Sequence, residues 1–238
     1  MPNPRLYDLL QEFLPDDHSR QSSAFDLVPQ LISTDSSLTV LDLGCGSGAS
    51  RQQFLNLNKD IFWVGLDIRD SPEVRDRKSS KHEGSYCCFD GKTIPFRADS
   101  FDLIFCTQVL EHVRYPERLI AEVNRVLKPG GSFVGSLSYL EPFHSFSYWN
   151  MTPFCFAAVV REANLSLVEL RPCIDVLTLI MRQLLLRPKF FDRWAIRESP
   201  LNKVISIYGK IARKSTKEVN ALKLQFCSFF CFAAIKKC

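Results

Sequence analysis

From residue 37 onward, the hydrophobic pattern alternates between short apolar runs and longer amphipathic runs. The apolar runs predict strands, several of them apolar nearly throughout, which is typical of strands buried on both faces of a parallel sheet; they cover residues 38–43, 61–68, 85–89, 101–107 and 132–138. The runs between them have the period of a helix and cover residues 50–57, 116–127 and 153–163. This alternation predicts an α/β fold.

The ends of the chain follow a different pattern. Residues 6–14 and 22–32 predict two short helices, and residues 166–170 and 226–235 predict two further strands. Between those strands, a stretch broken at two prolines predicts two or three basic amphipathic helices. We therefore expect three parts. Residues 1–36 form an N-terminal helical cover, and residues 37–174 with 225–238 form the α/β core. Residues 175–224 form a basic helical insert, which we interpret as a lid.

Composition restricts the class of protein. The chain has 238 residues, of which 46% are hydrophobic and 24% are charged, as in ordinary globular proteins. Its apolar runs fall far short of the roughly 18 residues that a membrane-spanning helix needs. Nine cysteines, without a Cys-x-x-Cys pair, argue against a disulfide framework or a structural zinc site. These features predict a cytoplasmic protein.

Charge is distributed unevenly along the chain. Residues 1–170 hold 16 Lys/Arg against 22 Asp/Glu, whereas residues 171–238 hold 14 against 4. This asymmetry indicates an acidic body and a basic appendage that meets an anionic substrate or surface. A solvated helical face is the alternative interpretation.

Half of the ten glycines are concentrated in two short loops. The first loop follows an apolar strand in the run Val40-Leu41-Asp42-Leu43-Gly44-Cys45-Gly46-Ser47-Gly48 and opens a helix. Glycine lets the backbone turn sharply and approach a ligand, and the helix start supplies free N–H groups. Asp67, at the end of the next strand, can accept both hydroxyls of a ribose. Together these features predict a nucleoside-binding site.

The loop by itself does not identify which nucleoside is bound. The spacing Gly44-x-Gly46-x-x-Ala49 also satisfies the dinucleotide fingerprint. Three features point away from NAD: Asp42 precedes the loop where an apolar residue is usual, Gly48 adds a third glycine, and Lys128-Pro129-Gly130-Gly131 leads into the fifth strand.

These motifs, in this order, resemble those of the class I S-adenosylmethionine-dependent methyltransferases, in the subgroup of small-molecule, type 11-like enzymes. The resemblance covers about residues 37–170 and the last strand, and its motifs lie at residues 40–48, 65–68, 89–91 with 94–96, 100–113 and 125–131. It implies a Rossmann-like sheet of seven strands, mostly parallel, whose last strand is antiparallel. It also implies S-adenosyl-L-methionine as the cofactor.

The resemblance further assigns roles to individual residues. Asp42 would hold the amino-acid part of the cofactor, Asp67 the ribose, and Ile68 and Asp90 the adenine. The full cofactor set is Asp42, Gly44, Cys45, Gly46, Gly48, Asp67, Ile68, Asp90, Gly91, Gln108 and Val109. Two of these side chains have structural alternatives, because Asp90 can cap a turn and Gln108 can satisfy a loop carbonyl.

The acceptor side is predicted from the loop after the fifth strand. Relatives carry Pro-x-His there, followed by aromatic residues, and Pro142-Phe143-His144 matches this pattern. Histidine suits a base at neutral pH, so His144 is the candidate base or substrate contact. The candidate substrate residues are His112, Tyr148 and Trp149, although Glu111 and His112 can also simply fix the loop into the following helix. The reaction requires no metal.

The sequence therefore predicts a methyltransferase that acts on a small-molecule, glycan or lipid-precursor acceptor, at oxygen. A catalytically inactive protein that binds cofactor or a partner is one alternative. A nucleic-acid methyltransferase is another, but Thr107-Gln108-Val109-Leu110 stands where an Asn/Asp-Pro-Pro-aromatic motif is expected, and the basic residues lack interleaved aromatics. For residues 175–214, a peripheral membrane contact and a plain stabilising role remain alternatives to the lid.

Overall fold

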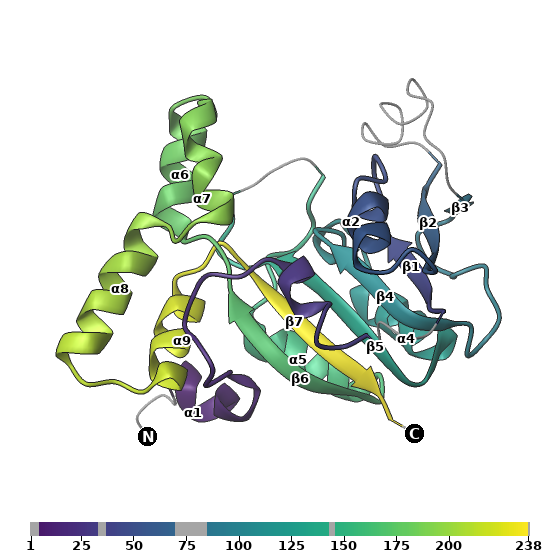
Figure 1. Ribbon diagram of the computed structural model, residues 1–238, viewed down its shortest axis with the longest axis horizontal. Helices are drawn as coiled ribbons and strands as arrows, with labels where there is room; N and C mark the ends of the chain where they lie inside the picture. Colours follow the sequence, from purple (N-terminus) through teal and green to yellow (C-terminus); the bar gives the residue numbers. More distant parts are fainter. Residues whose placement is uncertain (1–4, 33–36, 70–84, 143–145, 238) are drawn as a thin grey trace.

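The computed structural model describes residues 5–32, 37–69, 85–142 and 146–237. Its centre is one seven-stranded sheet with the order β3-β2-β1-β4-β5-β7-β6 (Figure 1). The strands are β1 Thr39–Leu43, β2 Phe62–Ile68, β3 Ser85–Phe89, β4 Phe101–Thr107, β5 Leu127–Ser138, β6 Leu165–Pro172 and β7 Phe229–Lys236. Neighbouring strands are parallel except β7, which is antiparallel to β5 and β6. The predicted seven-stranded, mostly parallel sheet with an antiparallel last strand is confirmed.

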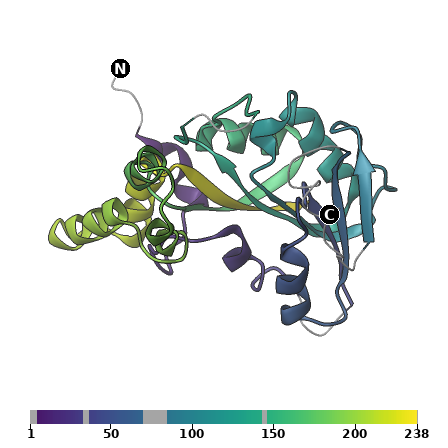
Figure 2. The same cartoon turned by 90° about the horizontal axis from the view of Figure 1, so that it is seen from above.

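Helices cover both faces of this sheet, and the view from above separates the two layers (Figure 2). On one face, α4 (Pro116–Val126) and α5 (Pro153–Glu162) bury apolar side chains such as Ile120 and Phe156 in the larger core cluster. On the other face, α2 (Ser50–Leu57) contributes Phe54 to a second cluster. Because strand side chains alternate between faces, each central strand supplies both clusters. This accounts for the continuous apolar runs in the sequence.

The N-terminal segment is less helical than its sequence predicts. The helix expected over residues 22–32 is wrong, because only the 3₁₀ turn η2 (Ala24–Leu27) forms there. Ser23 and Asp26 close this turn by a capping box, and Pro29 follows within the predicted run, where a helix interior would lose a hydrogen bond. Similarly, α1 (Leu6–Leu10) ends early and continues as the 3₁₀ helix η1 (Gln11–Phe13).

Two strand boundaries also differ. β5 begins at Leu127, earlier than expected, because Leu127 pairs with Phe101 before a register shift in the ladder. β7 begins at Phe229, later than expected, because residues 226–228 bond to the chain beside them rather than to a strand. Phe226 N–H donates to Lys223 and Ser228 N–H donates to Ile174.

The insert between β6 and β7 contains more helices than predicted. They are α6 (Val176–Leu184), the 3₁₀ turn η4 (Lys189–Phe191), α7 (Arg193–Ile196), α8 (Pro200–Ile211) and α9 (Thr216–Gln225). The Asp175 side chain caps α6 at Thr178 N, and Asp175 also pairs with Cys227 where the insert returns to the sheet. Since β6 runs parallel to β5, the insert leaves the sheet at the edge where the parallel strands end (Figure 1).

The N-terminal segment is bonded to this insert. Lys223 is fully buried and donates to Ser19 O and to the Glu198 carboxylate. Asn220 Nδ2 donates to Pro15 O at 2.9 Å, and Gln21 Nε2 donates to Trp194 O at 2.7 Å. The cover and the insert are therefore joined through buried polar groups, while the lid role itself stays a prediction. Within the ranges given above, no helix is both long and apolar enough to cross a bilayer.

Candidate functional site

The glycine loop lies where the carboxyl ends of β1, β2 and β4 meet. Gly44, Gly46 and Gly48 all have positive φ angles, of 74°, 49° and 81°. A Cβ at Gly44 would overlap the side chain of Val109, which follows β4, and a Cβ at Gly48 would overlap the hydroxyl of Tyr86 on β3. Both the backbone conformation and the space therefore require glycine. Tyr86 is a neighbour of the loop that the sequence did not single out.

Asp67 joins this loop to the end of β2. Its side chain is only 8% exposed, its Oδ2 accepts from Gly46 N at 2.7 Å and its Oδ1 accepts from Ile68 N at 2.7 Å. A carboxylate oxygen has more than one acceptor position, so both oxygens can also receive hydroxyl groups. The geometry agrees with the predicted ribose contact and adds a second role, the support of the loop.

Asp42 is a buried carboxyl beneath the loop. It is 4% exposed and accepts from the hydroxyl of Ser50, which in turn accepts from Trp63 Nε1 at 3.2 Å. The pKa of Asp42 is raised to about 7, mainly by burial and in smaller part by the nearby Asp67 charge. Such a group is stabilised in its ionised form by a cation, and the ammonium of an amino-acid moiety is one. The sequence analysis did not identify Ser50, which is the first residue of α2. Its position at the start of a predicted helix was the only signal for it in the sequence.

The predicted adenine side is formed by the ends of β2 and β3. A Cβ at Gly91, whose φ is 77°, would lie 3.7 Å from Ile68 Cγ2, so these two predicted residues are neighbours. Asp90 Oδ1 accepts from Lys92 N and Thr93 N, both at 2.9 Å, and these bonds lower the pKa of Asp90. Asp90 thus caps a turn, which was the structural alternative. Both observed bonds end on one oxygen, so the second oxygen is compatible with the predicted adenine contact.

A polar cluster lies at the ends of β4 and β5 and in the segments that follow them. Gln108 has a φ of 54° and is held by a bond from its N–H to Ser136 O at 2.9 Å. Its amide, oriented to suit its neighbours, donates to Glu111 Oε1 at 3.1 Å and to Glu141 Oε2 at 3.2 Å. The Ser138 hydroxyl also lies between these carboxyls, 3.0 Å from Glu111 Oε1 and 2.6 Å from Glu141 Oε2. Gln108 therefore organises a pair of carboxyl groups rather than a loop carbonyl.

Glu111 is the most buried member of this cluster. Its side chain is 2% exposed, and its Oε2 has no hydrogen-bond partner within the part of the chain that the structure describes. The pKa of Glu111 is raised to about 7, mainly by burial and in smaller part by the Glu141 charge. Sequence reasoning treated Glu111 as a loop residue and missed this carboxyl pair, because Ser138 lies at the end of β5 and Glu141 in the segment that follows it.

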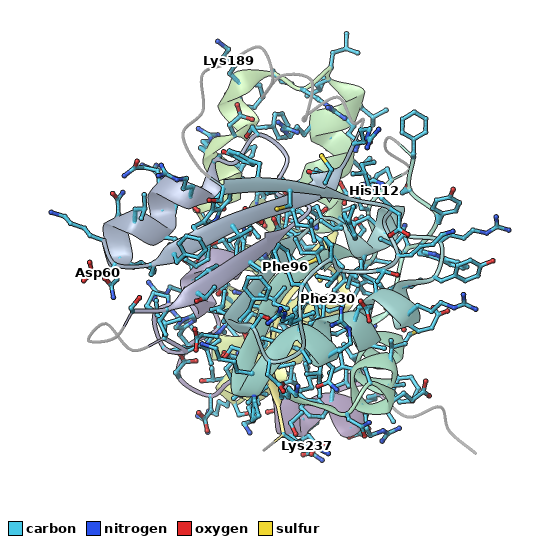
Figure 3. All side chains as sticks on the ribbon, turned by 90° about the vertical axis from the view of Figure 1, so that its right-hand side faces the viewer. Asp60, Phe96, His112, Lys189, Phe230 and Lys237 are labelled. Atoms are coloured by element: carbon cyan, nitrogen blue, oxygen red, sulfur yellow. The ribbon has the colours of Figure 1, made fainter. Side chains whose placement is uncertain are left out.

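The aromatic segment after β5 is attached to the same region. Tyr148 N and Trp149 N donate to Glu111 O at 2.7 and 3.3 Å, and Trp149 Nε1 donates to Val113 O at 2.9 Å. Both aromatic side chains are nevertheless largely exposed. His112 (Figure 3) ends the 3₁₀ turn η3 (Leu110–His112) and directly follows Glu111, whose carbonyl accepts the N–H groups of Tyr148 and Trp149. The structure thus brings His112, Tyr148 and Trp149 together, whereas His144 lies outside the described residues.

The sheet order, the glycine loop and the two buried aspartates define a nucleoside-binding α/β domain whose ligand lies at the carboxyl edge of the strands. Among the residues that the structure places, no group of three or more His, Cys, Asp and Glu side chains is arranged to hold a metal ion.

Comparisons with known proteins name the family. Residues 41–135 match the family described as "Methyltransferase domain". The ubiquinone biosynthesis O-methyltransferase of Nitrosococcus oceani is 30% identical over 135 residues, which cover 54% of this chain and 52% of that protein. Residues 41–135 are thus a methyltransferase domain, and solved structures that share the fold hold S-adenosyl-L-methionine or S-adenosylhomocysteine. Its matches span about half the length of the curated relatives, or less.

Solved structures share the fold at low sequence identity. The complex of the Trm112 methyltransferase activator with a methyltransferase from Haloferax volcanii gives a TM-score of 0.60 at 19% identity, covering 90% of this chain and 88% of that one. Phosphoethanolamine N-methyltransferase 2 from Haemonchus contortus, in complex with S-adenosyl-L-methionine, gives 0.58 at 15% identity, covering 90% and 52%. These likenesses support the fold, and the residues described above fit the cofactor.

Proposed function

We propose that this methyltransferase transfers the methyl group of S-adenosylmethionine to a hydroxyl oxygen of a small molecule or lipid precursor. The observation that carries the proposal is the polar cluster of Gln108, Glu111, Ser138 and Glu141. It includes the neighbour in sequence of Val109, whose side chain packs against Gly44 of the glycine loop. It offers carboxyl and amide groups that can orient a hydroxyl at the edge where the cofactor is expected. The name of the Nitrosococcus oceani relative, an O-methyltransferase, supports oxygen as the methylated atom.

The roles of the chain's own residues follow from their positions. When bound, the cofactor supplies a methyl group on a sulfonium, which is already a good electrophile. The ionised Asp42 would hold its ammonium and Asp67 its ribose, fixing the methyl group for in-line attack. The polar cluster would align the acceptor hydroxyl, whose proton must leave as the new O–C bond forms and the S–C bond breaks.

Two groups are candidates for receiving that proton. His144 is proposed from the sequence, because its ordinary pKa suits a base near neutrality. The buried Glu111 carboxyl is the candidate among the described residues, because burial raises its pKa to about 7. If His144 is the base, His144→Ala lowers kcat by about 10²-fold or more. If Glu111 is the base, Glu111→Gln has this effect and His144→Ala does not.

The test of the function is release of S-adenosylhomocysteine over a panel of acceptors. We expect turnover with catechols, hydroquinones or other hydroxylated molecules, and an increase of about 10-fold or more in the KM for S-adenosylmethionine after Asp67→Ala. Asp60→Ala, at an exposed residue just before the start of β2, is the control and should leave turnover unchanged. Methyl transfer to amines or RNA instead would overturn the choice of oxygen. Cofactor binding without turnover on every acceptor class would favour the inactive, ligand-binding alternative.

A further inference from the structure

Two helices of the insert expose apolar stripes to solvent. On α6, Leu177, Met181 and Leu184 follow one another at helical spacing and are 56, 47 and 70% exposed. On α8, a second stripe has the same spacing and is between 53 and 79% exposed; it consists of Val204, Ile207, Tyr208 and Ile211. α6 and α8 pack against each other, so the stripes belong to one region of the molecule (Figure 1).

The opposite side of α8 is buried through Asn202, Ile205 and Gly209. Asn202 Nδ2 donates to Cys173 O and to Gln21 Oε1, each at 3.0 Å. An ordinary surface helix turns its apolar stripe inward, whereas α8 buries Ile205 beside these polar contacts and leaves the larger apolar stripe outside. Specific contacts therefore set the orientation of α8 and hold its apolar stripe toward the solvent.

The turn after α6 extends the same surface. Leu186 is 90% exposed, and Leu186 and Arg187 both have positive φ angles, 59° and 57°, which are unfavourable for side chains of this size. Phe190 follows at 52% exposure, and Lys189 marks the outer end of the insert, far from the sheet (Figure 3). Of the twenty large hydrophobic side chains that are exposed in the described residues, ten lie between residues 177 and 211. Such concentration on a soluble surface indicates an interaction site.

The charge of this region identifies the class of partner. Residues 175–214 contain nine Lys or Arg against three Asp or Glu. The exposed basic side chains alternate with the apolar stripes and include Arg187, Lys189, Arg193, Lys203, Lys210 and Arg213. An apolar face flanked by basic residues complements an anionic lipid surface. The apolar side chains contact the acyl chains, and the basic side chains bind the phosphates.

The surface is also preformed. Gln21 bonds to Trp194 and Asn202, and the buried Lys223 bonds to Glu198 and to Ser19 of the N-terminal segment. These contacts attach α7, α8 and α9 to the rest of the protein. A docking surface that is already rigid loses little conformational entropy on binding.

We propose that α6, α8 and the turn between residues 185 and 190 form a peripheral docking surface for an anionic phospholipid bilayer. The insert begins at the edge of the sheet that also carries the polar cluster, so docking brings the acceptor side of the enzyme near the lipid surface. The inference concerns where the enzyme works and does not depend on which acceptor it methylates.

The test is co-flotation of the full chain with vesicles. We expect flotation with phosphatidylcholine vesicles containing about 30% phosphatidylglycerol at about 0.1 M NaCl, and at least about 10-fold less with pure phosphatidylcholine. Binding should weaken at about 0.5 M NaCl, because salt screens the basic residues. The double variant Leu184→Ser with Leu186→Ser should lose about 10-fold or more in partitioning.

Matched variants test whether a loss of flotation is specific to the docking surface. Leu9→Ser with Phe62→Ser removes two exposed apolar side chains outside the insert, which are 40 and 57% exposed, and should float like the wild type. Lys203→Gln with Lys210→Gln should reduce flotation with anionic vesicles only. Calorimetric binding of S-adenosylhomocysteine, unchanged in all these variants, reports that each has folded.

Three outcomes overturn the proposal. The first is a wild type that stays at the bottom of the gradient with anionic vesicles at low salt. The second is a Leu184→Ser, Leu186→Ser variant that floats as well as the wild type. The third is self-association in sedimentation without vesicles that this variant abolishes, since the surface would then be the contact between two copies of the chain.

Discussion

We propose two roles for the Asp67 carboxylate. It accepts from Gly46 N within the loop, and in the proposed cofactor site it accepts the ribose hydroxyls. Asp67→Ala should weaken binding of S-adenosylhomocysteine by about 1.5–3 kcal/mol, the scale of hydrogen bonds to a charged group. Isothermal titration calorimetry measures this, with Asp60→Ala as the control. An unchanged affinity would remove Asp67 from the cofactor site.

The raised pKa of Asp42 predicts that cofactor binding depends on pH. Its pKa of about 7 in the free protein is caused mainly by burial, so near pH 7 about half of the molecules carry a proton there. A bound ammonium favours the ionised form and lowers this pKa, so cofactor binding should release about half a proton near pH 7 and fewer as the pH rises above 8. Affinity should correspondingly fall as the pH drops from 7 to 5.

Calorimetry in phosphate and in Tris at the same pH measures the released protons, because the two buffers differ in ionisation enthalpy. Glu111→Gln is the matched control, since it removes the other carboxyl whose pKa burial raises to about 7 while leaving the cofactor contacts in place. If the observed binding enthalpy is the same in both buffers, no proton is released and the ammonium role of Asp42 is wrong. It is also wrong if the difference between the buffers disappears in Glu111→Gln.

At the scale of elements, the contact between Gly44 and Val109 sets the distance between the β1 loop and the end of β4. Gly44→Ala should lower the free energy of unfolding by about 1–3 kcal/mol, because the new Cβ overlaps Val109 and the φ of 74° disfavours a side chain. Chemical denaturation measures this loss. Adding Val109→Ala should recover part of the lost unfolding free energy by removing the overlapping methyl groups, and an additive loss would contradict the proposed contact.

Gly46→Val, in the same loop, should abolish cofactor binding.

At the scale of the whole molecule, Lys223 connects the N-terminal segment with the insert. Burial lowers its pKa, while the bond to Glu198 opposes this change. Lys223→Met keeps the volume but leaves the Glu198 carboxylate without its cation, and should cost about 3 kcal/mol of unfolding free energy. Lys203→Met, on the exposed side of α8, should cost little. Thermal denaturation compares the two variants, and equal melting temperatures would mean that the buried pair does not hold the two parts together.

Sequence alone determined the sheet and the cofactor loop, because both depend on local patterns. Apolar strands buried on two faces produce continuous runs, and a loop with three positive φ angles requires Gly44, Gly46 and Gly48. The overpredicted helix over residues 22–32 shows the limit of such patterns. An apolar periodicity is insufficient when Pro29 and a capping box favour a short turn.

Only the tertiary structure decided which distant groups share an environment. The Glu111 and Glu141 carboxyls come from the segments that follow β4 and β5, and the raised pKa of Glu111 follows from burial that no local pattern encodes. The insert illustrates the same point. Its sequence predicts amphipathic helices, but their outward apolar face depends on Asn202, Gln21 and Lys223, whose bonds join segments far apart in the chain. Periodicity gives a helix its apolar side, and tertiary contacts decide which side faces the solvent.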